Sequence, residues 1–501
     1  MTRILESVNA VVWGAPALVL ILGIGLLVSI RTGFAQLRLF PEALGGFFRK
    51  LWGKGRGSGG VTPFQALCTA LAATVGTGNI AGVAGAIAIG GPGAVFWMWI
   101  CALLGMATKF AEATLAVRYR QKENGELVGG PMYMIRNAMP GRWHFLGSIY
   151  SFFGIVAAFG VGNATQVNAV ITGINEAIIA FGGRQTRFGD LLMAVILAAV
   201  ICGILLGGMR RIGRIAEQLV PFASVLYLLL GLGVIIARFS FVDDAFSAIF
   251  RGAFCPRAVT GGAVGSLLTA LRVGVSRGVF TNEAGMGTAS IAHASADVRH
   301  PAEQGLMGIM EVFLDTIVIC TVTALVILLS GVAIPYGEDV GAALTARAFC
   351  TVYGDWASVI IAAALCCFAI ATVLGWGLYG ARCAQFLFGS GVWKRFVLLQ
   401  AATVILSAML KTGTVWLLSE TVNGLMAIPN LIALAYLSPE LRRLTIDYNK
   451  KLTRTGVNGG TYEDIYQCKP LRAFSHAQIP SFGGKGKGGR KEDLPSEHRP
   501  A

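Results

Sequence analysis

Hydrophobic residues fall into long runs along most of the chain, separated by short polar segments. Each run holds about 20 apolar residues, enough for a helix to cross a bilayer core of roughly 30 Å. The first run is too long for the apolar part of a cleavable signal peptide, and further spans follow it, so we predict that it stays in the protein. The pattern predicts about eleven transmembrane helices, over residues 8–30, 62–90, 93–117, 145–181, 189–207, 214–237, 263–295, 305–333, 354–381, 395–411 and 413–437.

Two of these spans are interrupted by polar, glycine-rich sequence. The first interruption is residues 74–79, Thr-Val-Gly-Thr-Gly-Asn, and the second is residues 276–285, Ser-Arg-Gly-Val-Phe-Thr-Asn-Glu-Ala-Gly. Unpaired backbone groups in hydrocarbon cost several kcal/mol each, so a break at that depth is tolerated where it lines a cavity or binds a ligand. Two breaks in corresponding spans of two halves are typical of a transporter's binding site.

The basic residues gather in the loops of one side, namely 31–60, 118–144, 208–213, 296–304 and 382–394, and in the C-terminal tail. Basic loops stay cytoplasmic, so the N-terminus is predicted outside and the tail inside. One accessory helix then precedes ten core helices, and two sets of five enter the membrane from opposite sides as an inverted repeat. The predicted regions are an accessory helix with a basic loop (1–61), two five-helix repeats (62–237 and 238–437) and a basic, disordered tail (438–501).

Composition excludes a soluble globular domain, because 55% of the residues are hydrophobic and only 13% are charged. The net charge of +15 does not indicate nucleic-acid binding, since 12 of the 41 Lys and Arg residues follow Pro439 and most others lie in loops. Most of the ten cysteines lie inside apolar spans and act as small hydrophobic residues. Only Cys255 and Cys350 share an outer loop side where a disulfide could form.

The first break suits the carboxylate of an amino acid. A half-helix that begins there presents unpaired N–H groups and a positive dipole end, with no obstruction from Gly76 or Gly78. We therefore predict that Thr77, Gly78 and Asn79 hold the carboxylate. The ammonium group needs acceptors, which the end of the other half-helix offers around Gly278, Phe280, Thr281 and Asn282. The alternative is that these Gly/Thr clusters serve only close helix packing.

A co-transported cation such as Na⁺ needs several hard oxygen ligands. Backbone carbonyls and hydroxyl or amide side chains at the breaks can supply them. The candidate ligands are Thr74, Val75, Thr281 and Thr372, with Asn282 as a further oxygen donor.

Several longer motifs resemble the alanine or glycine:cation symporter family over about residues 60–440. They are Gly90–Ile100 with Leu104-Gly105, Gly129–Tyr133, Gly278–Gly287, Gly375-Trp376 with Tyr379-Gly380, and Asn423–Asn430. The resemblance implies an all-α, polytopic membrane protein with the leucine-transporter-like 5+5 inverted repeat, in which the first and sixth core helices are discontinuous. It also implies Na⁺-coupled or sometimes H⁺-coupled uptake of small neutral amino acids, usually alanine or glycine.

The same resemblance adds residues to the expected pocket. It implies that Gln166 and Asn163 face the substrate and that Phe280 and Trp376 wall its side-chain end, leaving room only for a small side chain. Two plainer interpretations stay open: Trp376 could face lipid, and Gln166 could make only an interhelical hydrogen bond.

The sequence departs from the family where two adjacent hydroxyl residues often bind Na⁺, because the pair here is Ala371-Thr372. The loss of one ligand should weaken Na⁺ binding there, which gives some support to coupling by H⁺ instead. Charged residues near the second break are either proton carriers or helix-joining ion pairs; they are Arg272, Arg277, Glu283, Glu311 and Asp315. Lys109 and Glu112 are predicted to snorkel or to pair at a gate.

These observations predict a secondary symporter of the cell membrane that imports alanine or glycine with Na⁺ by alternating access. H⁺ coupling and selectivity for glutamine or serine are the alternatives within transport. An ion channel is a poorer fit to inverted five-helix halves. No nucleotide loop, Gly-x-Ser-x-Gly elbow or His-Glu-x-x-His motif is present, so neither a primary pump nor an enzyme is expected. The expected partners are the amino acid and membrane lipid, with no cofactor beyond the transported ion.

Overall fold

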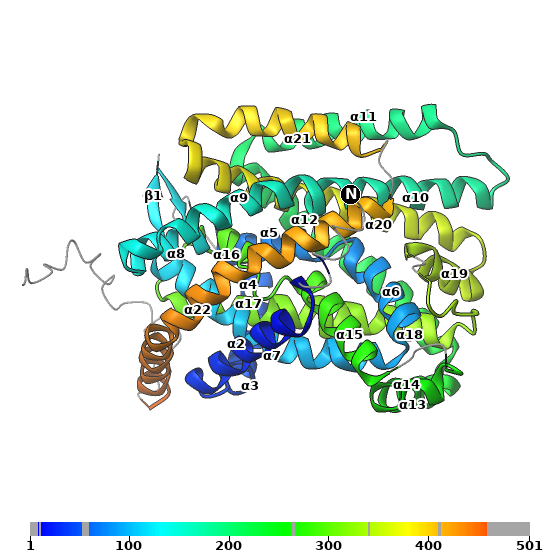
Figure 1. Ribbon diagram of the computed structural model, residues 1–501, viewed down its shortest axis with the longest axis horizontal. Helices are drawn as coiled ribbons and strands as arrows, with labels where there is room; N and C mark the ends of the chain where they lie inside the picture. Colours follow the sequence, from blue (N-terminus) through cyan, green and yellow to red (C-terminus); the bar gives the residue numbers. More distant parts are fainter. Residues whose placement is uncertain are drawn as a thin grey trace, which may run out of the picture.

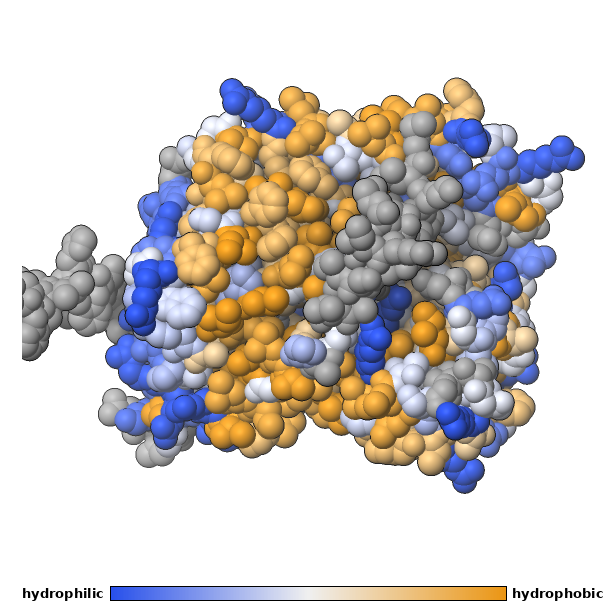
Figure 2. All heavy atoms as spheres, viewed as in Figure 1, coloured by the Kyte–Doolittle hydropathy of each residue, from blue (hydrophilic) through white to orange (hydrophobic). Residues whose placement is uncertain are grey.

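The computed structural model describes residues 9, 12–52, 60–123, 125–262, 266–338, 341–408 and 412–457. This part of the chain is a bundle of helices, most of which run along the horizontal axis of Figure 1. Figure 2 shows a broad hydrophobic band across the middle of the molecule, with hydrophilic residues at its two ends. Such a band suits a hydrocarbon layer flanked by water.

Each span predicted from the apolar runs contains helix within the part of the chain that the structure describes. The helices are α2 (Ala15–Thr32), α5 (Pro63–Thr74) with α6 (Ala81–Gly90), α7 (Gly93–Arg118), α9 (Phe145–Phe159) with α10 (Thr165–Ala180), α11 (Arg187–Leu205), α12 (Gly208–Ala237), α15 (Leu267–Asn282) with α16 (Thr288–His293), α17 (Pro301–Val312) with α18 (Thr321–Leu329), α20 (Trp356–Phe388), α21 (Trp393–Ser407) and α22 (Thr412–Val457). Among the described residues, seven helices are long and apolar enough to span a membrane, or eight if bent pairs are counted. The total of eleven spans stays a prediction.

The connecting segments also contain regular structure. They carry the helices α3 (Ala35–Arg38), α4 (Phe40–Trp52), α8 (Pro131–Ala138), α13 (Val242–Phe254), α14 (Pro256–Val259) and α19 (Gly341–Tyr353), and the antiparallel strands β1 (Gln121–Glu123) and β2 (Glu126–Val128). Short 3₁₀ turns are η1 (Thr77–Asn79), η2 (Gly141–Trp143), η4 (Phe239–Phe241) and η6 (Ser390–Val392). Two π-helical segments, η3 (Gly160–Ala164) and η5 (Phe313–Cys320), lie within the α9–α10 and α17–α18 spans.

The first interrupted helix, α5 with α6, lies between two groups of helices. On one side α15 and α17 pack against α7, and on the other α20 packs against α9, α10 and α12. The broken pair joins the groups, since α5 contacts α12, α16 and α20 while α6 contacts α15. The breaks are therefore held inside the bundle.

The far ends of the two interrupted helices are joined through their backbones. Val61, just before α5, pairs in parallel with Ala296, which follows α16. The N–H of Asp297 donates a hydrogen bond of 2.8 Å to the Val61 carbonyl. Arg120 donates to the carbonyls of Ala294 and Ala296 from the end of α7.

Two expectations from the sequence are wrong in detail, and the disulfide that the sequence allowed is not formed. Residues 276–282 are helical, and the second break is residues 283–287, because the chain turns only at Glu283, Gly285 and Gly287, which all have positive φ. Residues 438–457 continue α22 instead of forming a disordered tail, since apolar residues recur there at helical spacing and are buried, namely Leu441, Leu444 and Tyr448; the rest of the predicted tail, 458–501, lies outside the described residues. Cys255 and Cys350 are both free thiols.

Candidate functional site

The first break is a short extended segment between two half-helices. Helix α5 ends at Thr74, Gly76 is extended (φ −147°, ψ −152°), and the chain resumes as η1 and α6 with a bend of 59°. The side chain of Asn79 holds this turn, because its Oδ1 accepts a hydrogen bond of 2.9 Å from the Gly76 N–H. Its Nδ2 donates to Oδ1 of Asp315 on η5 at 2.7 Å. The break is therefore fixed to the α17–α18 span.

Two backbone donors at this break have no partner within the described part of the chain. The N–H groups of Thr77 and Gly78 make no hydrogen bond to any described residue. They stand where the second half-helix begins, so the positive end of its dipole adds to their pull on an anion. Of the three residues predicted to hold a carboxylate, Thr77 and Gly78 present free donors, whereas the amide of Asn79 is occupied by Asp315.

Three buried side-chain oxygens also lack a protein partner here. They are Thr77 Oγ1, Gln166 Oε1 on α10 and Thr372 Oγ1 on α20, and none has a hydrogen bond within the described structure. Gly76 is the close neighbour of two of them: a Cβ added to it would lie 2.6 Å from Thr372 Oγ1 and 3.5 Å from Gln166 Oε1. Unpaired buried oxygens are costly, so their convergence indicates a place that a polar ligand or cation completes.

The N–H groups of Gly285 and Gly287 at the second break are hydrogen-bonded, in contrast to those of Thr77 and Gly78 at the first. Oε1 of Glu112, on α7, accepts from the N–H groups of Gly285 and Gly287 at 3.0 Å each and from Nδ2 of Asn430, on α22, at 2.7 Å. The Asn430 amide also donates to the Gly285 carbonyl at 2.9 Å. Glu112 is fully buried, which excludes snorkelling, the first of its two predicted roles. It fills the anion-binding turn with the protein's own carboxylate.

The end of α15 supplies acceptors. The carbonyls of Thr281 and Asn282 receive no hydrogen bond from a described group, because the N–H groups of Gly285 and Met286 point to other partners. The Gly278 carbonyl accepts from the Thr281 hydroxyl at 2.9 Å. These carbonyls form the negative end of the helix dipole, which suits an ammonium group or a cation.

Trp376 and Phe280 lie against the breaks. The Trp376 side chain is fully buried, which excludes the lipid-facing alternative, and its Nε1 donates to Oε1 of Glu283 at 2.9 Å. The other oxygen of Glu283 accepts from the Thr288 hydroxyl at 2.5 Å. Phe280 is 8% exposed and reaches Gly78, where an added Cβ would lie 3.4 Å from its Cδ1.

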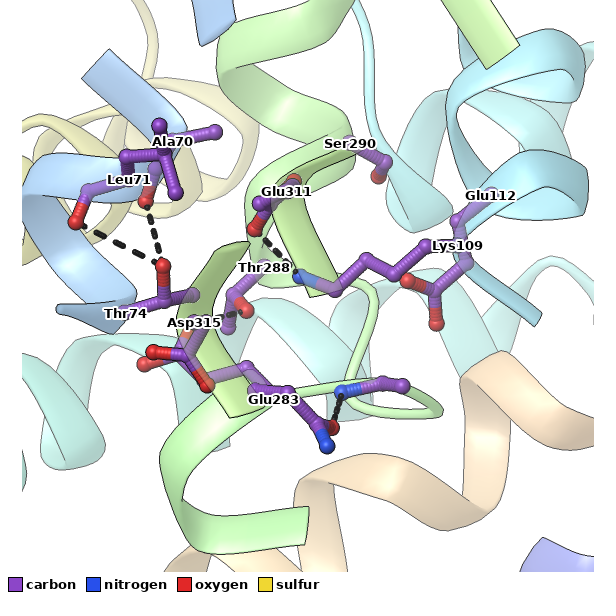
Figure 3. Close-up of polar contacts among 12 residues, drawn as sticks. Ala70, Leu71, Thr74, Lys109, Glu112, Glu283, Thr288, Ser290, Glu311 and Asp315 are labelled. Atoms are coloured by element: carbon purple, nitrogen blue, oxygen red, sulfur yellow. Dashed lines mark hydrogen bonds and ion pairs between the residues drawn. The ribbon is translucent and has the colours of Figure 1, made fainter. Parts of the chain in front are cut away.

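The predicted cation ligands fall into two groups. Thr74, Val75 and Thr372 lie together at the end of α5, where the Thr74 hydroxyl donates to the carbonyls of Ala70 and Leu71 at 3.2 and 3.4 Å (Figure 3). A hydroxyl used as a donor keeps its lone pairs for a cation.

The second group lies on the other side of the first break. Thr281 is close to Gly78, since a Cβ added there would lie 3.3 Å from Thr281 Cγ2. Asn282 donates to the Thr316 hydroxyl at 3.2 Å, and that hydroxyl donates to Asp315 at 2.8 Å. Asp315 thus joins the candidate oxygens, although the sequence suggested it only as a proton carrier or ion pair.

One expected site residue points elsewhere, and the amide nitrogen of another is bound within its own span. Asn163 forms a reciprocal pair with Gln400 on α21, at 3.3 Å to the Gln400 carbonyl and 3.1 Å from its Nε2, so it does not face the breaks. The Gln166 amide donates to the Val161 carbonyl and the Thr165 hydroxyl, both at 3.2 Å, within its own span. No interhelical bond is found for it among the described residues.

A buried polar network beside the second break is absent from the sequence-based site. Lys109 Nζ lies 2.9 Å from Glu311 Oε1, and both side chains are fully buried (Figure 3). The other oxygen of Glu311 lies 2.8 Å from His293 Nε2, and Gln304 lies 2.7 Å from His293 Nδ1. The network joins α7, α16 and α17, which settles Glu311 as a helix-joining ion pair and shows that Lys109 does not snorkel. Polar residues within apolar runs were its only sequence signal.

Comparison with known proteins gives a consistent result. The model of the sodium:alanine symporter family matches residues 1–460. The chain is 43% identical over 440 residues to the sodium/alanine symporter AgcS of Methanococcus maripaludis, covering 87% of this chain and 94% of AgcS. It is 36% identical over 474 residues to the probable sodium/glutamine symporter GlnT of Bacillus subtilis, covering 93% and 95%.

A solved structure supports the fold. The chain matches the crystal structure of MhsT in complex with L-phenylalanine with a TM-score of 0.55 at 13% identity, over 76% of this chain and 97% of MhsT. This likeness concerns the fold alone, and it confirms a helical, leucine-transporter-like architecture. The number of spans and the internal repeat stay predictions.

Proposed function

Because the chain belongs to the sodium:alanine symporter family, whose members couple amino-acid transport to a cation, we propose that it imports alanine or glycine together with Na⁺ by alternating access. The observation that carries this proposal is the convergence of unpaired groups on the first break: two backbone N–H groups and three buried oxygens from three spans. A zwitterion and a small cation satisfy both kinds of group at once.

The amino acid is proposed to bind between the two breaks. The N–H groups of Thr77 and Gly78 hold its carboxylate, and the carbonyls of Thr281 and Asn282 accept from its ammonium group. Phe280 and Trp376 bound the space for its side chain, with Gln166 adding an acceptor. Glu112 already accepts from the N–H groups of Gly285 and Gly287 at the second break, which favours the first break as the place for the substrate carboxylate.

Sodium is proposed to bind at the end of α5, with Thr74, Val75 and Thr372 as ligands, while Thr281 and Asp315 offer a second cation position. Ala371 contributes no hydroxyl, so a carbonyl or water completes the first cage. One positive charge moved through about 100 mV is worth about 2.3 kcal/mol. That energy supports roughly a fifty-fold gradient of a neutral solute before the Na⁺ gradient is added.

Glutamine selectivity is the alternative that a relative's name favours, since GlnT is described as a probable sodium/glutamine symporter. The buried Trp376 argues for a smaller substrate, because its indole is fixed to Glu283 and a larger side chain would have to displace it.

We further propose that residues 62–237 and 238–437 are inverted repeats and that the N-terminus lies outside.

The test is radiolabelled uptake into proteoliposomes. Alanine, glycine, serine and glutamine are each supplied with an inward Na⁺ gradient, with choline in its place, or with an acid-outside gradient. Accumulation of alanine or glycine that requires Na⁺ supports the proposal. Uptake that follows only the proton gradient contradicts the sodium coupling, and uptake of glutamine alone contradicts the substrate.

A further inference from the structure

A cavity separate from the two breaks lies along the first half of α15. One face of α15 packs on α7 through Gly274 and Gly278. Another face opens into a cavity of about 450 Å³, whose wall includes Asn9, Trp13, Ile89, Arg272, Ser276 and Arg277. On the face drawn in Figure 2, hydrophilic atoms interrupt the hydrophobic band beside α15.

This cavity leads toward the candidate site. Arg277 precedes Phe280 by three residues, about 4.5 Å along the axis at roughly 1.5 Å per residue, and Arg272 lies further toward the start of the helix. Phe280 in turn contacts Gly78 of the first break. Exposure falls along the same face, from the exposed Arg272 to the partly buried Ser276 and Arg277 and the buried Phe280. Phe280 thus follows the cavity wall along α15 and contacts the first break.

The charge of the wall selects one kind of ligand. The guanidinium group of Arg272 lines it, and no acidic side chain is among its described lining residues. Arg272 forms no ion pair with any described residue. An arginine within a membrane span is tolerated where it faces water or a partner, and its planar fork matches a carboxylate with two parallel hydrogen bonds.

We propose that this cavity is an access site that binds the carboxylate of the amino acid before it passes Phe280, with Arg272 as its principal contact. The inference rests on the proposed function for the identity of the amino acid. The substrate then passes from the Arg272 guanidinium to the N–H groups of Thr77 and Gly78. Both sites therefore bind the carboxylate of the amino acid. A site of this kind raises the rate of capture, and its loss therefore raises the KM for uptake more than it lowers the maximal rate.

Arginine modification tests binding without transport. The purified full-length protein is treated with phenylglyoxal, and modification of Arg272 is followed by peptide mass spectrometry. Alanine, propionate, alaninamide and sodium chloride are compared at equal ionic strength. If alanine and propionate slow the modification of Arg272, and alaninamide and chloride do not, the result supports a site for a carboxylate. No slowing, or equal slowing by chloride, overturns it.

Uptake kinetics provide the second test. Arg272→Gln is expected to raise the KM for alanine about tenfold with a nearly unchanged maximal rate, which corresponds to about 1.4 kcal/mol. Arg272→Lys keeps the positive charge but not the forked guanidinium. Its KM for alanine should lie between the KM of the wild type and that of Arg272→Gln. Arg251→Gln, an exposed arginine on α13, is the matched control and should resemble wild type. An unchanged KM in Arg272→Gln, or an equal rise in the control, overturns the proposal. If the wild type takes up no alanine, the proposed function fails, and propionate protection still decides the access site.

Discussion

Trp376 donates a hydrogen bond of 2.9 Å from its indole nitrogen to Glu283, the residue at which α15 ends. Glu283 has a φ of +54°, an unfavourable backbone conformation for a residue with a side chain. The two bonds to its carboxylate, from Trp376 and Thr288, help to hold it there. This pair therefore connects α20 directly to the turn of the second break.

Removing the indole N–H should weaken transport. Trp376→Phe leaves one carboxylate oxygen of Glu283 buried without its donor, a loss of about 1.5–3 kcal/mol for a charged partner. Alanine uptake should fall on the order of tenfold or more. Trp97→Phe is the control, because the Trp97 indole bonds the Ala253 carbonyl at 3.2 Å, away from the breaks. Equal losses in the two variants would contradict a specific role for the Trp376 bond.

Gly76→Ala should abolish uptake without unfolding the protein. The added Cβ would lie 2.6 Å from Thr372 Oγ1, so that side chain must move out of the convergent oxygen cluster. A misplacement of about 1 Å at a reacting or binding centre can cost on the order of a hundredfold. Gly45→Ala is the matched control, because its added Cβ meets no atom within 4 Å. Both variants are compared by uptake and by size-exclusion profile, and normal uptake by Gly76→Ala would refute the assigned geometry.

The buried ion pair of Lys109 and Glu311 should be sensitive to the loss of one partner. Glu311→Gln leaves the Lys109 ammonium buried without its counter-charge, and breaking such a pair costs about 3–5 kcal/mol. The cost is measured as the decrease in the free energy of unfolding of the detergent-solubilised protein. Adding Lys109→Met to the variant should recover part of the loss. Glu42→Gln, at the exposed pair with Arg49, should cost at most about 1 kcal/mol.

The pH dependence of stability should contain a contribution from His300, which lies just before α17 and outside the membrane-spanning segment. The pKa of His300 is lowered from the usual 6.5 to about 4; burial is the main cause, the Lys451 charge acts in the same direction, and the Asp447 carboxylate opposes both. Its Nδ1 accepts from the Ala302 N–H, which favours the neutral ring.

The unfolded chain binds a proton at His300 below pH 6.5, whereas the folded protein does so only near pH 4. This contribution to stability is complete above pH 6.5 and is lost as the pH falls from 6.5 toward 4. His300→Asn keeps a helix-capping side chain and should flatten this part of the unfolding profile. Wild type and variant are compared by thermal unfolding between pH 7 and 4, and parallel profiles would rule out the contribution.

Apolar runs predicted where the spans lie because span length is set by bilayer thickness, a property of the solvent rather than of the fold. The first break was predictable for a related reason: Gly76 and Gly78 sit within an otherwise apolar run. The second break was placed too early because helical hydrogen bonding continues to Asn282, and the chain turns only where glycines with positive φ follow.

The polar partners were not predictable in the same way. Asn163 and Gln166 lie within one turn of each other, yet one pairs with Gln400 and the other faces Gly76. Similarly, Glu112 and Lys109 are three residues apart, but their partners come from α22 and α17 and from the loop of the second break. Those partners are more than 170 residues away in the chain, so pairing depends on helix rotation and crossing, which local sequence does not encode.

The parallel bridge between Val61 and Ala296 bears on the timing of the transport cycle. Side chains exchange rotamers in picoseconds to nanoseconds, whereas packed helices shift in microseconds to milliseconds. The ends of α5 and α16 are joined there by main chain, through the Asp297 N–H and the Val61 carbonyl, and a change of side-chain rotamer does not break that bond. We expect α5 and α16 to move apart there as whole helices. The microsecond-to-millisecond timescale of that motion should then limit the rate at which substrate is released at this end of the protein.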